Sequence, residues 1–264
     1  MIKLALSGAS GRMGVSLLEL IAHSEQWQLS QAVVSPHNPK LGQDAAVLLP
    51  GVAAAFAVPL TAWGQARLAG ADVAIDFSSR ESTPALLAEC VKARIPLVLA
   101  TTGLTATEDA LIAAAARQIA IVKSANTSVG IALLQRAVAL LAKALPETFD
   151  IDISDAHHAH KKDAPSGTAL GLGASAASAR GWPVPPACTR QAGAREPKSI
   201  GYASVRAGDI VGEHTVLFAG PSERISVTHV ASDRLVFARG ALRAAEWLQG
   251  QPAGVYSMQD VLGV

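Results

Sequence analysis

A glycine-rich segment near the N-terminus constrains the fold of this chain more than any other feature. The apolar run 2–6 is typical of a short β-strand, and the loop from Gly8 to Gly14 follows it directly. Apolar residues then recur at helical spacing over 15–21. This strand–loop–helix unit predicts a turn in which backbone amides can hold the pyrophosphate of a dinucleotide. Taken alone, its GxxGxxG spacing also fits an ordinary tight turn.

The first half of the chain goes on alternating between strand and helix. Strand-like runs occupy 29–34, 71–77, 97–100 and 119–122, and helical patterns cover 82–93 and 111–117. Such alternation predicts a Rossmann-like parallel sheet with helices on both faces, which makes the chain an α/β protein.

The second half has a different pattern. Helical patterns cover 131–144, 169–179 and 235–248, and strand-like runs occupy 149–154, 200–206, 210–219 and 224–230. Short turns join the last three strand-like runs, which predicts an antiparallel meander. We therefore expect a second, α+β domain with a mixed or antiparallel sheet.

Charge and hydropathy argue against two kinds of partner. Lys and Arg number 22 against 21 for Asp and Glu, a net charge of +1, so no long-range field would hold a nucleic acid or an anionic membrane. No apolar run reaches the roughly 18–20 residues of a membrane span, and run 2–6 is too short for a signal peptide. A soluble, cytoplasmic protein is expected. Cys90 and Cys188 match no zinc spacing and are expected to be inert thiols.

The densest polar cluster of the chain extends from Asp155 to Thr168. Three histidines and two lysines fall within 157–162, and they would be costly to bury unpaired. Ser166 and Gly167 then lead into the predicted Ala-rich helix, whose first amides would face an anion. Cations beside a helix start predict a site for carboxylates.

Two residues of this cluster, His157 and Lys161, are candidates for proton transfer. They stand four apart, so an extended chain would put both on one face. Histidine exchanges a proton near neutral pH, and lysine can supply a proton and a positive charge. A metal site built from the histidines is an alternative, although neighbouring ammonium groups repel a cation and no cysteine accompanies them. A solvated loop without function is another.

Polar residues at strand ends predict the rest of a cofactor site. The runs Ala100 to Gly103 and Ser124 to Thr127 each follow a strand, and ligands bind at the carboxyl ends of parallel strands. The second strand ends at Val34 without the acid that would hold an adenosine ribose. A 2′-phosphate would therefore not be repelled, and Ser35, His37 or Lys40 could contact it. The prediction is NADPH as the preferred cofactor, with NADH also used.

These motifs, in this order, resemble those of the dihydrodipicolinate reductase (4-hydroxy-tetrahydrodipicolinate reductase) family. The resemblance covers nearly the whole chain, and its histidine motif is the most specific part. The motifs that carry it are Gly8-x-x-Gly11-Arg12-Met13-Gly14, Thr101-Thr102-Gly103, Asn126-x-Ser128-Val129-Gly130, His157-His158-x-His160-Lys161-x-Asp163-Ala164-Pro165-Ser166-Gly167-Thr168-Ala169 and Val205-Arg206-Ala207-Gly208-Asp209-Ile210-Val211-Gly212-Glu213-His214-Thr215.

The resemblance implies NAD(P)H-dependent reduction of 4-hydroxy-tetrahydrodipicolinate, a small cyclic dicarboxylate, to tetrahydrodipicolinate with loss of water, a step of lysine and diaminopimelate biosynthesis. It implies that His157 donates and accepts a proton and that Lys161 donates one. Implied substrate contacts are His158, Gly167 and Thr168. Implied cofactor contacts are Gly8, Ala9, Ser10, Gly11, Arg12, Met13, Ala100, Thr101, Thr102, Ser124, Ala125, Asn126 and Thr127. No metal is implied.

The resemblance also implies two domains with different functions. Residues 1–127 and 236–264 would form the dinucleotide-binding domain, and 128–235 would bind substrate and pair subunits into a homotetramer. Four positions depart from the family pattern: Val34 where an acid is frequent, Ala100 for a glycine, Thr127 for an aromatic residue and Ala159 for an arginine. None of these departures removes a group that the chemistry needs.

Three other functions remain open at this point. A non-catalytic nucleotide sensor would keep the glycine loop but would not need the paired His157 and Lys161. A metal-dependent hydrolase would bind zinc through the histidines and lose activity to chelators. A reductase of the same architecture could act on another cyclic imine or keto acid, and only substrate testing separates it.

Overall fold

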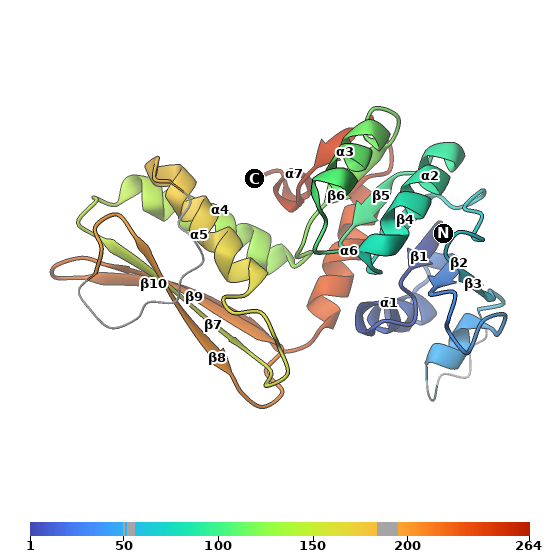
Figure 1. The fold of residues 1–264 in the computed structure, drawn as a ribbon, viewed down its shortest axis with the longest axis horizontal. Coiled ribbons are helices and arrows are strands. Elements are labelled where there is room, and N and C mark those ends of the chain that lie inside the picture. The colour runs from blue at the N-terminus through green and yellow to red at the C-terminus, as the bar shows by residue number, and fades with distance from the viewer. Residues whose placement is uncertain (50, 52–55, 184–194) are drawn as a thin grey trace. The chain divides into compact units, whose positions relative to one another are not determined.

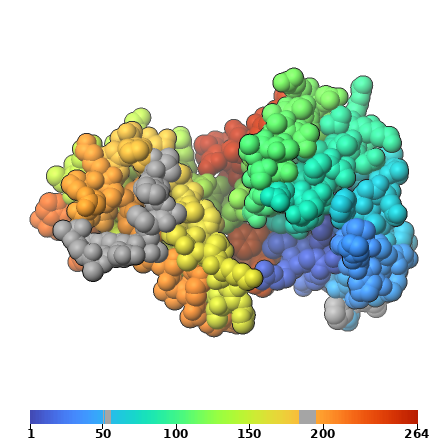
Figure 2. Space-filling view, viewed as in Figure 1, coloured from blue at the N-terminus to red at the C-terminus, as the bar shows by residue number. Residues whose placement is uncertain are grey.

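The computed structural model describes residues 1–49, 51, 56–183 and 195–264, which form two compact units (Figures 1 and 2). Unit 1 consists of Met1–Ser128 with Leu235–Gly263, and unit 2 consists of Val129–Arg234. Cys188 lies outside the described residues. Cys90 is buried and not in a disulfide.

Unit 1 contains a sheet of seven parallel strands in the order β11-β6-β5-β4-β1-β2-β3. The strands are β1 Ile2–Ser7, β2 Trp27–Val34, β3 Leu60–Ala62, β4 Val73–Asp76, β5 Leu97–Leu99, β6 Ala120–Lys123 and β11 Gly254–Tyr256. The chain adds strands in one direction from β1 to β3 and in the other from β4 to β6. The order therefore reverses between β1 and β4, and ligands of open α/β sheets bind outside the carboxyl ends of such strands.

Helices cover both faces of this sheet. They are α1 Arg12–Ala22, α2 Thr83–Ala93, α3 Ala106–Ala115, α6 Leu235–Trp247 and α7 Met258–Leu262, with the short 3-10 helices η1 Ala45–Leu48 and η2 Arg80–Ser82. Helices α2 and α3 pack on one face, while α1 and α6 pack against each other on the opposite face (Figure 1). The strands are buried on both sides, which explains their nearly continuous apolar runs.

Three details of unit 1 differ from the sequence prediction. Strands β3 and β11 were not predicted, because three residues give too short a pattern to be distinguished from a loop. Helix α3 begins at Ala106 rather than at 111. Thr105 caps it through a reciprocal capping box with Glu108, so the helix starts before its apolar residues do.

Unit 2 contains a mixed sheet of four strands in the order β10-β9-β7-β8. The strands are β7 Asp150–His157, β8 Ile200–Arg206, β9 Gly212–Ala219 and β10 Arg224–Ala231, and the helices are α4 Val129–Ala144 and α5 Gly167–Arg180. The two helices pack against one face, where Leu134, Val138 and Leu172 meet Ile153 and Phe218. The predicted fold, a Rossmann-like parallel sheet with a second α+β domain, is confirmed.

The predicted antiparallel meander over 200–230 is wrong. Strands β9 and β10 form a hairpin, but β7 lies between β8 and β9 and runs parallel to β8. The chain passes from β7 to β8 by way of α5, and a strand–helix–strand connection makes the two strands parallel neighbours. Among the described helices, none is long and apolar enough to cross a membrane.

Candidate active site

Strand β7 ends in a carboxylate and an imidazole that both lie on its buried face. Side chains alternate along the strand, and Ile151 and Ile153 pack into the core of unit 2. Asp155 and His157 follow at the same two-residue spacing and are also buried. Buried charged groups are costly unless they have partners. The hydrogen bonds of this pair therefore decide what it can do.

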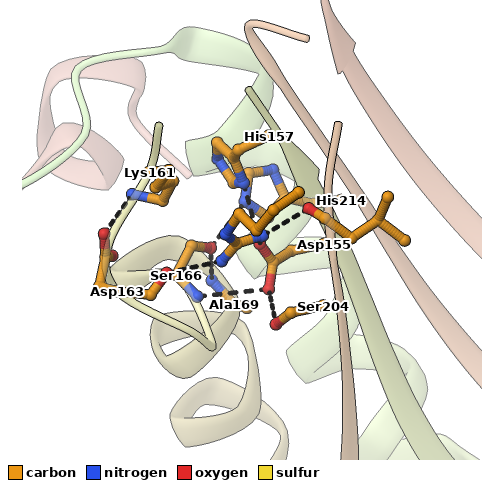
Figure 3. A network of polar contacts seen from close by, with 10 residues as sticks. Asp155, His157, Lys161, Asp163, Ser166, Ala169, Ser204 and His214 are labelled. Carbon is orange, nitrogen blue, oxygen red and sulfur yellow. Dashed lines mark hydrogen bonds and ion pairs between the residues drawn. The ribbon is translucent and has the colours of Figure 1, made fainter. Parts of the chain in front are cut away.

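Asp155 accepts hydrogen bonds from four donors (Figure 3). Its Oδ2 accepts from His157 Nδ1 and from Arg206 Nη1, each at 2.8 Å. Its Oδ1 accepts from the Ser204 hydroxyl at 2.8 Å and from the Ser166 amide at 3.3 Å. Both oxygens are satisfied, so the carboxylate stays ionised although its side chain is only 1% exposed.

The surroundings lower the pKa of both groups. Burial raises the pKa of Asp155, but the hydrogen bonds from Ser204, Arg206 and Ser166 outweigh it and hold that pKa below its usual value. Burial also lowers the pKa of His157, and the charge of Lys161 lowers it further, whereas the hydrogen bond that the ring donates to Asp155 raises it. The imidazole is therefore mainly neutral at neutral pH and can accept a proton there.

A turn of the chain separates Lys161 from His157. Strand β7 ends at His157, and the Lys161 amide then donates to the carbonyl oxygen of His158 at 3.1 Å. The expectation of an extended chain with both side chains on one face is therefore wrong, yet the two groups are close enough for the ammonium to lower the pKa of the imidazole. The Lys161 ammonium pairs with Asp163 at 2.9 Å (Figure 3). Loop 158–164, yellow in Figure 2, lies on the surface of unit 2.

Helix α5 starts beside this cluster. Ser166 caps the helix by accepting the Ala169 amide at 3.1 Å, and its hydroxyl also lies 3.1 Å from His214 Nε2. Gly167 is exposed, and nothing lies within 4 Å of the place its Cβ would take. Amides in the first turn have no acceptor within their own helix. The backbone at Gly167 is therefore open to an anionic group, and Thr168 follows it, partly buried.

The remaining histidines of the motif lie near the same loop. His158 is partly buried and His160 is exposed, with their ring centroids 6.4 Å apart. Within the part of the chain that the structure describes, no three His, Cys, Asp or Glu side chains are grouped so as to hold a metal ion. The cluster instead combines a neutral base, an ammonium and a helix start. This combination suits the binding of a carboxylate and proton exchange with the molecule that carries it.

Unit 1 has a pocket of about 250 Å³ at the carboxyl ends of β1, β2 and β4. It is lined by Ser7, Gly8, Ser10, Gly11, Val33, Val34, Ser35, Trp63, Phe77, Ser78, Ser79 and Ser82. Four of the predicted cofactor residues, Gly8, Ser10, Gly11 and Ser35, are among them. The pocket lies where the strand order reverses, the usual position of a nucleotide in this class of sheet.

Each glycine of the loop has its own structural reason. Gly8 has φ +81, and its Cβ would lie 2.4 Å from the carbonyl oxygen of Phe77. A Cβ on Gly14 would lie 2.2 Å from the Gly8 oxygen, so this glycine allows helix α1 to pack closely on the loop that follows β1. At Gly11 a Cβ would lie 3.2 Å from that same oxygen and 3.9 Å from the Phe77 oxygen, so this position is less confined than Gly8 or Gly14. The sequence thus leaves room at Gly11 that the protein itself does not fill.

Helix α1 starts without a cap. Its N-cap residue is Gly11, which offers no side-chain acceptor, and its first turn contains no acid. The Gly8 and Ala9 amides both donate to the Val33 oxygen, at 2.9 and 3.0 Å, and Ala9 is fully buried. The amides of Arg12 and Met13 have no acceptor among the described residues. Helices α3, α5 and α7 begin with side-chain caps, whereas the free amides at the start of α1 are suited to an anionic group.

The segment after β5 is tied to a buried acid. Thr101 is buried and its hydroxyl donates to Asp76 at 2.7 Å, and the Ser78 amide donates to the same carboxyl group at 3.2 Å. Burial raises the pKa of Asp76. Ala100 is buried while Thr102 is exposed. Of these predicted contacts, Thr102 is the one whose side chain is open to a ligand.

The segment after β6 turns inward at its end. The Ser124 hydroxyl donates to the Asn126 carbonyl oxygen at 2.7 Å. Thr127 is buried, and its hydroxyl donates to the Phe237 oxygen in α6, also at 2.7 Å. Ala125 is exposed and Asn126 is partly so. A ligand can therefore reach this segment at 125–126, whereas the side chain of Thr127 contributes to the packing of unit 1.

Sequence analysis assigned no role to four residues of these sites: Asp155, Arg206, His214 and Asp76. A signal for Asp155 was available, because it continues the buried alternation of Ile151 and Ile153 and precedes His157 by two. Asp76 ends a wholly apolar run, which is also unusual for an acid. Arg206 and His214 lie in the family-like run 205–215, but that run suggested no role for them, because their partners lie on other strands.

Comparison with known proteins covers the whole chain. The family descriptions "Dihydrodipicolinate reductase, N-terminus" and "Dihydrodipicolinate reductase, C-terminus" match residues 2–127 and 130–262. The chain is 46% identical to the 4-hydroxy-tetrahydrodipicolinate reductase of Thiobacillus denitrificans over all of its own length and 99% of the relative's. It is 45% identical to that of Burkholderia lata over the full length of both chains.

The fold has solved relatives as well. A dipicolinate-bound dihydrodipicolinate reductase from Paenisporosarcina sp. TG-14 superposes with a TM-score of 0.74 at 20% identity, covering 98% of each chain. At that identity the likeness concerns the fold. The family models and the full-length relatives go further and confirm what the sequence motifs predicted: the chain belongs to the dihydrodipicolinate reductase family, a family of oxidoreductases.

Proposed function

We propose that this chain reduces 4-hydroxy-tetrahydrodipicolinate to tetrahydrodipicolinate, with loss of water, using a reduced nicotinamide dinucleotide, in lysine and diaminopimelate biosynthesis. The relatives at 45–46% identity bear the name of this reductase. The observation that carries the proposal is the position of Lys161. The chain turns after β7, so that Lys161 lies near enough for its charge to lower the pKa of His157, and the Ser166 amide at the start of α5 donates to Asp155, the partner of the same ring.

The groups of unit 2 have complementary roles in this proposal. The helix start at Gly167 and Thr168, with His158 nearby, binds the carboxylates of the ring. Lys161 contributes positive charge and a proton. His157 exchanges a proton with the substrate through Nε2, because Asp155 occupies its Nδ1. A positioned general acid contributes about 10²–10⁴-fold in rate.

The residues of unit 1 fit the nicotinamide dinucleotide. The uncapped start of α1, with the amides of Arg12 and Met13, suits the pyrophosphate, and Gly11 leaves room for it. Ser10 and the segments at Thr102 and 125–126 are accessible at the same edge of the sheet. When bound, the cofactor supplies the hydride. Ala9 and Thr127 would contribute only through the backbone they support.

Both NADPH and NADH are proposed as cofactors, with NADPH preferred. The end of β2 has no acid, and the pocket is open at Ser35. Lys40 donates to the Val47 oxygen at 3.1 Å and would have to leave it to reach a phosphate. Ser35 therefore remains the best-placed contact. The homotetramer and the cytoplasmic location implied earlier stay predictions.

Cofactor oxidation tests the proposal. Purified protein is mixed with NADPH or NADH and with 4-hydroxy-tetrahydrodipicolinate that is generated enzymatically. Oxidation that requires the complete generating system is expected with both nucleotides. If the cofactor is consumed only with a different cyclic imine or a keto acid, the same architecture serves another substrate. No consumption with any of them contradicts a reductase.

A further inference from the structure

The side chain of Asp155 fixes the protonation pattern of a neighbouring ring. Its two oxygens accept hydrogen bonds from four donors. Of these four, only the ring nitrogen of His157 and the Ser204 hydroxyl could also act as acceptors. An ionised carboxylate only accepts hydrogen bonds, so His157 Nδ1 must carry the hydrogen. In the neutral ring the lone pair then resides on Nε2.

The Nε2 edge of His157 is kept clear. The nitrogen has no hydrogen-bond partner among the described residues and is not sealed from solvent. On one side it faces Gly212, where a Cβ would lie only 3.2 Å from Nε2. A residue larger than glycine would therefore crowd the one atom of the ring that is available to a substrate.

Arg206 shares the oxygen that His157 uses. Its Nη1 donates to Asp155 Oδ2 at 2.8 Å, and its Nη2 donates to the Asp163 carbonyl oxygen at 2.7 Å. Four charged or titratable groups face the ring: Asp155 from its own strand, Lys161 from the loop, Arg206 from β8 and His214 from β9. Lys161 and Arg206 lower the pKa of His157 through their charge, whereas Asp155 raises it. Asp155 is thus the one group that favours the imidazolium form.

We propose that Asp155, which Arg206 holds in place, is a positioning residue: it fixes His157 as the Nδ1–H tautomer and leaves Nε2 to exchange the proton with the substrate. The inference rests on the proposed function for its consequence in catalysis. The tautomer itself follows from the contacts of unit 2 and can be measured without any substrate.

The first measurement is the ¹⁵N spectrum of the histidine side chains in the full-length protein, with the His157 signals assigned from a His157→Gln variant. Above the pKa of the ring, Nδ1 is expected to give the shift of a protonated nitrogen and Nε2 that of an unprotonated one. The opposite pattern in the wild-type protein would overturn the inference. This arm requires no variant of Asp155 to fold.

The second measurement compares Asp155→Asn with Asp150→Asn, which makes the same change on the same strand at an exposed position. The side chain of asparagine has one accepting oxygen where aspartate has two, so at least one of the hydrogen bonds to this position must be lost. Asp155→Asn is expected to lower kcat at least tenfold with KM changed less than about threefold, since a general acid–base group contributes about 10²–10⁴-fold. Asp150→Asn is expected to keep wild-type kinetics.

The pH profile separates positioning from mere structural damage. Asp155 raises the pKa of His157, so its loss should move the acidic limb of kcat/KM to lower pH. Asp155→Glu, which keeps a carboxylate, should move it less. A uniform loss of activity at every pH, with an unmoved limb, would contradict the inference. If the protein fails to turn over the substrate yet shows the Nδ1–H tautomer, the proposed function fails and the positioning role stands.

Discussion

The imidazole rings of His157 and His214 meet edge to face, with their centroids 5.1 Å apart. His214 is 4% exposed, and its Nε2 lies 3.1 Å from the Ser166 hydroxyl that caps α5. Burial lowers the pKa of His214 to about 4, and the proximity of His157 contributes to the shift. The second ring is therefore a neutral neighbour that links His157 to the start of α5.

This depressed pKa predicts a loss of stability in acid. Between pH 6.5 and about 4 the unfolded chain binds a proton at His214 that the folded protein does not. The free energy of unfolding should fall through that window by on the order of 3 kcal/mol from this group. Denaturant titrations of wild type and His214→Gln across the window check it, with the exposed His23→Gln as control. An equal slope in wild type and His214→Gln would contradict the prediction.

Removal of either proton-exchanging group should slow turnover and spare the cofactor site. We expect His157→Ala or Lys161→Ala to lower kcat at least tenfold, because each removes a group that exchanges a proton or supplies charge. The dissociation constant for NADPH should stay within about threefold, since both residues belong to unit 2. His160→Ala and Lys162→Ala, at exposed positions of the same loop, are the matched controls. Near-normal turnover in both test variants would refute the assignment.

The glycines of the first loop should separate folding from binding. A Cβ on Gly14 has no room beside the Gly8 oxygen, so Gly14→Ala should lower the free energy of unfolding by about 2 kcal/mol or more. Gly11→Ala should lower the free energy of unfolding much less, because its Cβ would lie 3.2 Å from the Gly8 oxygen instead of 2.2 Å, but should weaken NADPH binding at least tenfold. Thermal melting and fluorescence titration of both variants test this. Equal effects of the two substitutions on stability would contradict it.

A carboxylate at the end of β2 should change the cofactor preference. Ser35 lines the pocket in unit 1, and an acid there would repel a 2′-phosphate. Ser35→Asp is expected to lower kcat/KM for NADPH at least tenfold and to change the value for NADH much less. Steady-state kinetics with each nucleotide decide the matter. A wild-type enzyme strongly biased to NADH would show the proposed NADPH preference to be wrong.

Helices and strands could be predicted from the sequence where their hydrophobic pattern was long and did not depend on distant parts of the chain. Helices α2, α4 and α6 and strands β1 and β2 agree with their predicted ranges, because each has several turns or several buried residues. Strands β3 and β11 have three residues each and lie at the two edges of the sheet, so they form only because β2 and β6 are there to pair with them. The position of β7 between β8 and β9 depends on the connection through α5, which strand patterns alone do not reveal.

The candidate site followed the same rule. His157, Lys161 and Gly167 are close in sequence, and a local motif was enough to find them. Arg206 and His214 reach Asp155 and Ser166 from other strands, at separations of 51 and 48 residues. Only the register of β7 against β8 and β9 brings them together. The glycine loop was found from its spacing, but its uncapped helix start became visible only in the backbone.

A crystal structure with NADPH and dipicolinate bound tests the central claim most directly. The account predicts the pyrophosphate at the start of α1, and a carboxylate of the ligand on the Gly167 and Thr168 amides. It also predicts the ligand ring beside His157 Nε2 and Lys161, against the nicotinamide. A ligand bound elsewhere, with residues 157–168 remote from the nicotinamide and from every other subunit's cofactor, would contradict it.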